Sequence, residues 1–356
     1  MKTKTLLSHS SKRGILAIAI LAVAVFGVSF LGLLVGSSHL SLSESLSALF
    51  GSGTPAAVRI VRAIRFPRVV AALVAGAGLS VSGLVMQTCL NNPLASPSTL
   101  GVSNAAVFGA NLSIIAFAGG FLSTGHNLSA YAAGANPYAT SALAFVFAAV
   151  SVLLILGLCH LRAFEPGVVV LAGVAIGAIW TAATTVLQFY ATDVGLSAAV
   201  IWTFGDLGRA TWRTDAIMGA VAAVGLLVFG LLSMRLNALL GGDAAAKSFG
   251  VNVRRLRFIC LFLGSLITAV CVSYLGVIGF LGVICPHAVK RILGQDHRVS
   301  VPASALTGSL LLLLADTASR SIGNGAALPV GAITSLLGAP FFLYVIFSKK
   351  EARRPC

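Results

Sequence analysis

The polar stretch at 235–257, RLNALLGGDAAAKSFGVNVRRLR, comes nearest in this chain to a known chemistry. Within it, GGDAAAKS nearly matches the phosphate loop G-x-x-x-x-G-K-[ST], which binds nucleotide phosphates through backbone N–H groups and a lysine. Gly241, Lys247 and Ser248 fit that motif. Ala246, however, stands where the second glycine is required, and no alternation of strands and helices surrounds the stretch. We therefore expect no nucleotide site here, so any ATP must be hydrolysed by a partner.

The same stretch predicts one short helix. Asp243 is placed to cap its start by accepting backbone N–H bonds, and Gly250 is placed to end it in a left-handed turn. The stretch lies between two long apolar halves and carries five basic residues against one acid. Such a short polar helix between apolar segments, which we call the knob, is suited to dock into the cleft of a partner protein.

Other chemistry is sparse. No nucleophile–base pair and no HExxH pattern is present, which disfavours a membrane-embedded enzyme. Ionisable residues inside membranes usually mark ion or proton paths, but the acids fall at the ends of apolar runs or in loops, with Asp316 near one such end. An ion-coupled secondary transporter is therefore disfavoured. The six cysteines show no CxxC spacing, so no metal site or disulfide framework is expected.

Composition indicates the elements that must position these residues. The chain has 356 residues, of which 58% are hydrophobic and 9% charged, with a mean hydropathy of +0.99. A water-soluble fold could not bury so much apolar surface, so we expect an all-α, polytopic membrane protein. The net charge of +15 then reflects internal loops facing anionic membrane lipid, and no nucleic-acid partner is expected.

Ten apolar runs predict about ten transmembrane helices. The first, at 14–36, follows a basic N-terminus and is longer than the core of a signal peptide. The runs lie at 14–36, 69–90, 100–121, 140–159, 168–190, 214–234, 257–275, 277–293, 300–319 and 328–347. The two runs around Gly276 merge in hydropathy, and we separate them at 274–276. Breaks are also expected at 91–97, which is rich in asparagine and proline, and at 198–210, as a short external helix.

Charge asymmetry predicts the topology. With both termini inside, 17 of the 24 lysines and arginines fall on internal segments, as the positive-inside rule requires. Spans 2–5 then begin outside and spans 7–10 inside, an arrangement typical of inverted repeats in transporters. The arginines before span 2 and Arg320 are external exceptions that need a reason. They either anchor to lipid phosphate or dock a partner.

Motifs along nearly the whole chain resemble one family. In order they are RFPR (65–68), GLVMQ (83–87), NPLA (92–95), LGVS (100–103), LAGV (171–174), AKSFGV (246–251), GFLG (279–282), PH (286–287), DHR (296–298), AD (315–316) with Arg320, LPVG (328–331) and GAP (338–340). With these motifs the chain resembles the FecCD-type permeases of ABC importers, which move iron–siderophores, heme or vitamin B12.

The resemblance implies a single permease domain over residues 1–356 with the type II ABC-importer fold. It implies a homodimer with two cytoplasmic ATPase subunits, which bind the ATP, and one external binding protein. No cofactor is expected on this chain. The membrane is the cytoplasmic membrane of a bacterium or archaeon. An iron chelate, as a ferric siderophore, is the expected cargo, with vitamin B12 and heme as the alternatives.

The resemblance also implies roles for individual residues. The segment 235–257 matches the family's ATPase-coupling loop, with its contact formed by Asp243, Ala246, Lys247, Ser248, Phe249 and Gly250. Arg65, Arg68 and Arg320 match positions that meet acids of the binding protein. Spans 5 and 10 line the pathway.

One turn departs from the family pattern. The turn before span 5 reads RAFEPG, where relatives often place small hydroxyl residues, so Glu165, Pro166 and Gly167 are candidates for the inner gate. The external loop at 121–138 is long for the family and has no assigned role.

Overall fold

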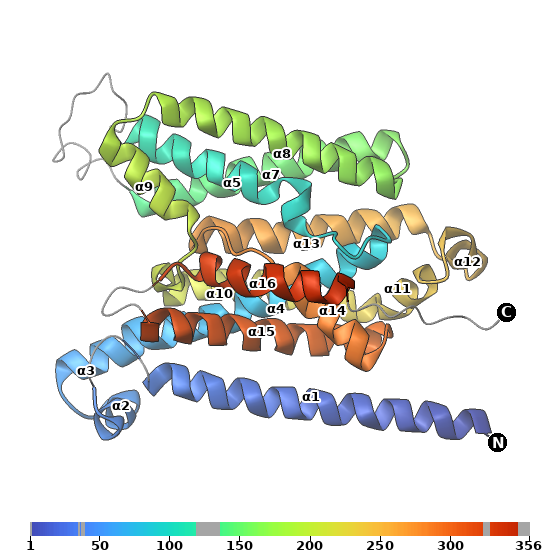
Figure 1. Ribbon diagram of the computed structural model, residues 1–356, viewed down its shortest axis with the longest axis horizontal. Helices are drawn as coiled ribbons and strands as arrows, with labels where there is room; N and C mark the ends of the chain where they lie inside the picture. Colours follow the sequence, from blue (N-terminus) through green and yellow to red (C-terminus); the bar gives the residue numbers. More distant parts are fainter. Residues whose placement is uncertain (1, 35, 37–39, 119–135, 323–327, 348–356) are drawn as a thin grey trace.

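The computed structural model describes residues 2–34, 36, 40–118, 136–322 and 328–347, and these form helices and turns without a strand. Most helices lie side by side along the long axis of the molecule (Figure 1). The first half contains α1 (Lys2–Leu34), α2 (Leu42–Leu49), α3 (Pro55–Arg59), η1 (Ile60–Arg65), α4 (Phe66–Cys89), η2 (Pro97–Leu100), α5 (Val102–Asn111), η3 (Leu112–Phe117), α7 (Pro137–Leu161) and α8 (Pro166–Phe189). The second half contains α9 (Asp193–Thr203), η5 (Leu207–Arg209), α10 (Trp212–Leu231), α11 (Ser233–Leu239), α12 (Asp243–Ser248), α13 (Val253–Leu275), α14 (Leu281–Leu293), α15 (His297–Ile322) and α16 (Val330–Phe347).

The all-helical prediction is confirmed, and the apolar runs coincide with helices. Among the described residues, seven helices are long and apolar enough to cross a membrane. The runs at 100–121 and 328–347 correspond to shorter apolar helices, and the run at 277–293 corresponds to α14, which has only 13 residues. Ten crossings therefore remain a prediction.

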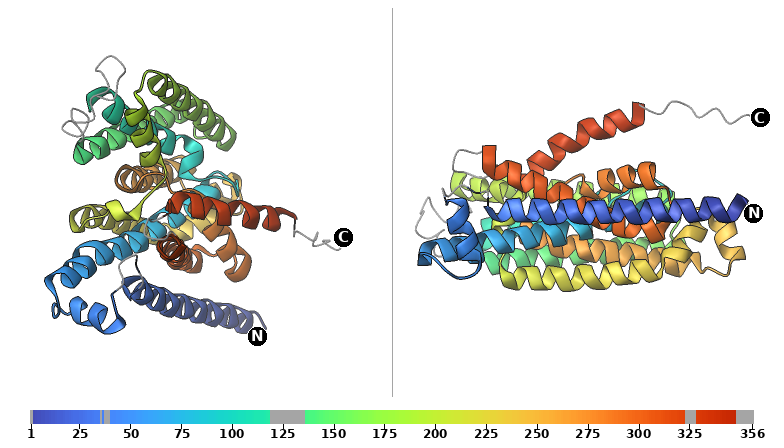
Figure 2. Two further views of the ribbon diagram at one scale, coloured as in Figure 1. Left: turned by 60° about the vertical axis from the view of Figure 1, so that its left-hand side comes forward. Right: turned by 90° about the horizontal axis from the view of Figure 1, so that it is seen from below.

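Helix α4 occupies the centre of the molecule, and small residues allow its neighbours to approach closely. A Cβ added to Gly76 would lie 2.5 Å from the carbonyl oxygen of Gly308 on α15. A Cβ on Gly83 would collide with the backbone of Gly282 at the start of α14. Helix α1 lies instead at the edge of the bundle, and only 11% of its most apolar segment is buried (Figure 1). Helix α16 slants away from the other helices (Figure 2).

The start of the second span differs from the prediction. The sequence placed this span at 69–90, with the arginines before it. The structure instead has continuous helix over Pro55–Cys89, preceded by α2, so Arg65 and Arg68 lie inside a helix. The π-helix η1 precedes Pro67, and the Phe66 N–H donates to the Val61 carbonyl. This wider turn accommodates a proline that cannot donate the usual helical bond.

The predicted breaks are present. Helix α13 ends at Leu275, and Gly276 has a φ of +79° before α14 begins. In the segment at 91–97, the Asn92 side chain accepts from the Leu94 N–H, so this turn satisfies its own backbone locally. The short helix expected over 198–210 is α9 followed by η5, beginning five residues earlier. Most of the loop expected at 121–138 lies outside the described residues.

Candidate functional site

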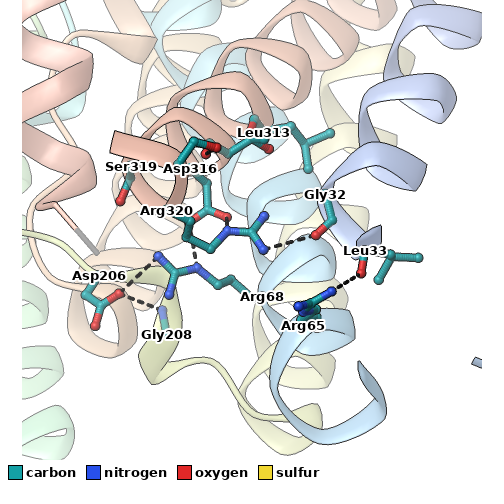
Figure 3. A network of polar contacts seen from close by, with 12 residues as sticks. Gly32, Leu33, Arg65, Arg68, Asp206, Gly208, Leu313, Asp316, Ser319 and Arg320 are labelled. Atoms are coloured by element: carbon teal, nitrogen blue, oxygen red, sulfur yellow. Dashed lines mark hydrogen bonds and ion pairs between the residues drawn. The ribbon is translucent and has the colours of Figure 1, made fainter. Parts of the chain in front are cut away.

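Three arginines gather at one end of the bundle, around a single buried carboxylate (Figure 3). Arg68 on α4 donates from Nε to Oδ1 of Asp316 on α15 at 2.7 Å. Arg320, one turn after Asp316, places its Nε 3.1 Å from the other carboxylate oxygen. The Asp316 side chain is 1% exposed. Because each oxygen faces a guanidinium, this buried charge is compensated on both sides.

The same cluster holds the end of α1. Arg65 donates from Nη1 to the carbonyl oxygens of Leu33 and Leu34 at 3.0 and 2.8 Å. Arg320 donates to the carbonyl of Gly32 at 3.0 Å. The last carbonyls of a helix lack partners within it and carry the negative end of its dipole, so cationic donors satisfy them well. The arginines thus tie the edge helix α1 to α4 and α15.

A second carboxylate lies at the surface of the cluster. Asp206, just before η5, places Oδ1 3.6 Å from Nη2 of Arg68, and its side chain is 47% exposed. The same oxygen accepts from the Gly208 N–H at 2.7 Å. The backbone of this turn accepts from the Val330 and Gly331 N–H groups at the start of α16, and Asp206 donates to the Leu275 carbonyl. We call Arg65, Arg68, Arg320, Asp316 and Asp206 the arginine cluster, and its end of the molecule the arginine end.

At the opposite end, α12 forms a protruding knob (Figure 1). Gly250 has a φ of +75°, and the Val251 N–H donates to the Ala246 carbonyl at 3.0 Å, which confirms the predicted left-handed turn. Ala246 is fully buried, whereas Phe249 is 77% exposed at the tip. Lys247, Ser248 and Gly250 are exposed too. The buried alanine fixes the knob to the bundle and leaves an aromatic ring free to contact another protein.

The predicted capping role of Asp243 is wrong. Gly242 occupies the cap position, without a side-chain bond. The Asp243 carboxylate instead accepts two bonds from the Arg257 guanidinium on α13, at 2.7 and 2.8 Å. Arg257 also donates from Nε to the Cys89 carbonyl, the last residue of α4. A charged bidentate pair outcompetes capping here because Arg257 is buried and needs an anion.

The turn before α8 contains two consecutive residues in the left-handed region, Ala163 and Phe164, with φ of +52° and +58°. The Phe164 ring is 1% exposed and packs edge-on against Phe258. That burial holds a backbone conformation that costs about 1 kcal/mol or more per residue outside glycine. Glu165 makes no capping bond at the start of α8.

The predicted gate turn and the knob share a cleft. Pro166 lines a cleft of about 520 Å³ together with the backbone before α12, Asp243 and Arg257. Glu165 and Gly167 are exposed and do not line this cleft. Of the three predicted gate residues, Pro166 is therefore the one that shares a cleft with Asp243 of the knob.

The exposed side of α8 is neutral and small-residue lined. Together with η2 and the start of α5 it bounds an open groove of about 610 Å³. Asn104 on α5 bridges to α8 by donating to the Gly177 carbonyl and the Thr181 hydroxyl, at 3.2 and 2.8 Å. Within the described residues, no group of three histidine, cysteine or acidic side chains lies close enough to bind a metal ion. This surface offers hydroxyl and amide contacts without charge.

Comparison with known proteins places this architecture. A family model described as the FecCD transport family matches residues 20–348. This chain belongs to the FecCD transport family. Among its relatives, a Methanocaldococcus jannaschii protein assigned provisionally as an ABC transporter permease is 44% identical, with 94% of this chain and 95% of that protein covered. The Fe(3+)-citrate import system permease YfmE of Bacillus subtilis is 32% identical, with 98% of each chain covered.

A further relative is named for a different cargo, and a solved structure allows the folds to be compared. The hemin transport system permease HmuU of Yersinia pestis is 36% identical, with 90% of this chain and 93% of that protein covered. The solved structure of a transporter, assigned provisionally to the metal-chelate type of ABC transporter and in an inward-facing conformation, matches with a TM-score of 0.78 at 26% identity, covering 93% of this chain and 98% of that one.

In this FecCD permease, the predicted docking arginines do come together, but they are buried, with exposed fractions of 3% for Arg65, 8% for Arg68 and 9% for Arg320. Asp316 and the carbonyls at the end of α1 draw these guanidiniums inward. The docking role itself stays a prediction, as do the coupling and gate roles.

Sequence reasoning missed Asp316, Asp206 and Arg257 as members of these sites. The i,i+4 spacing of Asp316 and Arg320 was the available signal.

Proposed function

We propose that this FecCD permease is the membrane subunit of a binding-protein-dependent ABC importer whose cargo is an iron chelate, a ferric siderophore. The observation that carries the proposal is the α12 knob, which projects from the bundle with an exposed aromatic tip and a defined left-handed exit. A protein that takes its work from a separate ATPase needs such a contact. The sparse charge along the apolar helices and the neutral groove beside α8 suit a bulky cargo driven by that work.

The proposed assembly is a homodimer with two ATPase subunits on the α12 side and one binding protein on the arginine side. Helix α1 begins at the same end of the molecule as α12, and α16 runs toward that end (Figures 1 and 2). This supports placing both termini inside with the knob, in a bacterial or archaeal cytoplasmic membrane. A cysteine replacing Ser43, in the first turn of α2, should then react with an impermeant maleimide in intact cells. One replacing Ser248 should react only after permeabilisation, and labelling of Ser248 in intact cells would overturn this topology.

Within this assembly, Asp243, Ala246, Lys247, Ser248, Phe249 and Gly250 form the ATPase contact. Arg65, Arg68 and Arg320 attract acidic groups of the binding protein. Glu165, Pro166 and Gly167 form the inner gate, a role supported by the cleft that Pro166 shares with the knob. ATP is bound by the partner subunits.

Uptake into proteoliposomes that contain the permease, its ATPase and its binding protein tests the proposal. We expect ATP-dependent accumulation of a ferric hydroxamate or ferric citrate complex that survives a protonophore. Hemin and cobalamin serve as alternative cargoes, since relatives are named for both. Uptake that collapses with the protonophore while ATP persists would point to ion coupling and contradict the proposal.

A further inference from the structure

We propose that Asp206 is an exchangeable carboxylate, occupying the place on Arg68 that an acidic side chain of an external partner protein takes on docking. This inference rests on the proposed docking function and names its point of contact. It also identifies the partner chemistry as a single surface carboxylate rather than a broad acidic face.

The two carboxylates on Arg68 differ in how firmly they are held. Asp316 is buried and bonded at 2.7 Å, whereas Asp206 is about half exposed and lies at 3.6 Å. Partly exposed ion pairs contribute little, because water competes for both charges. A carboxylate from outside can therefore displace Asp206 at small cost, while Asp316 stays in place.

The local charge favours an additional anion. Within the described residues, the arginine cluster holds three guanidiniums against two carboxylates. A fourth guanidinium, on Arg209, interacts electrostatically with Asp206, although burial lowers its pKa overall. Arg209 lies over the Trp202 ring and donates to two carbonyls of α9. An incoming acid thus meets a net positive environment even before Asp206 moves away.

Gly208 leaves access to Arg68 from the surface. This residue is exposed, and a Cβ added to it would lie 2.9 Å from Nη1 of Arg68. Any side chain at position 208 would therefore press on the guanidinium and cover the approach. Glycine is favoured here by this close approach and not by backbone conformation, since its φ is not positive.

Displacement of Asp206 would act on the proposed pathway. Its turn accepts the first N–H groups of α16 through the carbonyls of Phe204 and Gly205 and donates to the end of α13. Arg68 is the side chain that fixes this turn to α4 through an ion pair. A partner acid that takes over Arg68 removes this ion pair between the turn and the central helix.

Arginine modification by phenylglyoxal, followed by peptide mass spectrometry on the purified permease in lipid nanodiscs, tests the accessibility directly. Asp206→Asn keeps the side-chain oxygen that accepts from Gly208 but removes the charge. We expect it to raise the modification rate of Arg68 about two- to five-fold relative to that of Arg62, the range given by the loss of one partly exposed ion pair. Gly208→Ala should lower the rate.

Asp193→Asn is the matched control, because Asp193 is an exposed carboxylate on the neighbouring helix α9. It should leave the modification of Arg68 unchanged. Equal rates in Asp206→Asn and the unaltered protein, or equal increases in both aspartate variants, would overturn the proposal.

Docking of the binding protein separates this inference from the function on which it rests. Arg68→Gln leaves Asp316 paired with Arg320 and should weaken docking, whereas Asp206→Asn should strengthen it about two- to five-fold. If Arg68→Gln weakens docking but Asp206→Asn leaves it unchanged, the exchange is refuted and docking stands. If Arg68→Gln, and separately Arg320→Gln, leave docking unchanged at low salt, the docking function and the exchange both fail.

Discussion

The contacts at the two ends of α4 are of the same kind, but they differ in how firmly the carboxylate is held. At each end a buried guanidinium meets a carboxylate that is about half exposed, with exposed fractions of 47% for Asp206 and 45% for Asp243. Arg68 reaches Asp206 at 3.6 Å and has Asp316 as a second, buried anion. Arg257 holds Asp243 in a bidentate pair at 2.7 and 2.8 Å, and it also donates to the Cys89 carbonyl.

This difference matches what each end is proposed to do. A guanidinium with a second anion can exchange its outer partner without being left alone in the interior. A guanidinium with one carboxylate transmits every displacement of that carboxylate to the helices it joins, here α13 and the end of α4. The arginine end therefore suits the proposed exchange, and the α12 end suits the proposed rigid transmission.

The largest expected effect comes from removing Asp316, the second anion that stays on Arg68 when Asp206 is displaced. Asp316→Ala leaves Arg68 and Arg320 without their shared buried carboxylate, which should destabilise the fold by about 3–5 kcal/mol. Thermal unfolding in detergent, followed by the fluorescence of a thiol-reactive dye at the buried cysteines, measures the loss. Asp193→Ala is the control and should unfold like the unaltered protein. A melting temperature for Asp316→Ala equal to that control would remove the distinction between the two ends.

Next in size is Asp243→Asn at the α12 end. It leaves Arg257 with weakened compensation, and we expect a loss of about 1–2 kcal/mol, moderated because Asp243 is half exposed. ATP hydrolysis by the assembled complex should become less sensitive to the binding protein, since the link from α12 through Arg257 to the end of α4 is weakened. Asp193→Asn, which also neutralises an exposed carboxylate but lies on α9, is the matched control. Full stimulation of ATPase activity by the binding protein in Asp243→Asn would contradict rigid transmission.

A smaller effect is expected at the exit of the knob. Gly250→Val forces a β-branched residue into a left-handed conformation, at a cost of about 1 kcal/mol or more. No atom lies within 4 Å of the added Cβ, so the effect isolates backbone strain from packing. Transport should fall while membrane insertion stays normal. Gly157→Val, at a position with equally open space but no positive φ, is the control. Transport by a complex that lacks residues 243–249 would refute the coupling role altogether.

The smallest effect on stability is expected for Asp206→Asn. Arg68 retains Asp316, and asparagine can still accept from Gly208, so the melting temperature should change by less than that of Asp243→Asn. The comparison between the two asparagine variants is the sharpest test, because each removes one half-exposed carboxylate from a buried guanidinium. Equal losses of stability would show that the second anion at Arg68 does not matter.

Much of the architecture could be predicted from local sequence. Apolar runs locate the helices because burial in a membrane demands continuous hydrogen-bonded backbone. Gly276 marks the break between α13 and α14, and Gly250 marks the end of α12, since each adopts a positive φ that other residues resist. The order of motifs was sufficient to recognise the FecCD family. The start of the second span was predicted wrongly, because proline is usually a helix boundary and the π-turn that accommodates Pro67 has no simple sequence signal.

The sequence by itself thus determined the helices, the punctuating glycines, the exposed knob and the family. Only the tertiary structure decided which charges meet. Arg68 pairs with a carboxylate 248 positions away, and Arg257 bonds a carbonyl 168 positions away. A buried guanidinium must find an anion or a carbonyl, but nothing in its own segment specifies which one. That choice is made when α4 is packed between α15 and α13, where low dielectric makes any unpaired charge costly.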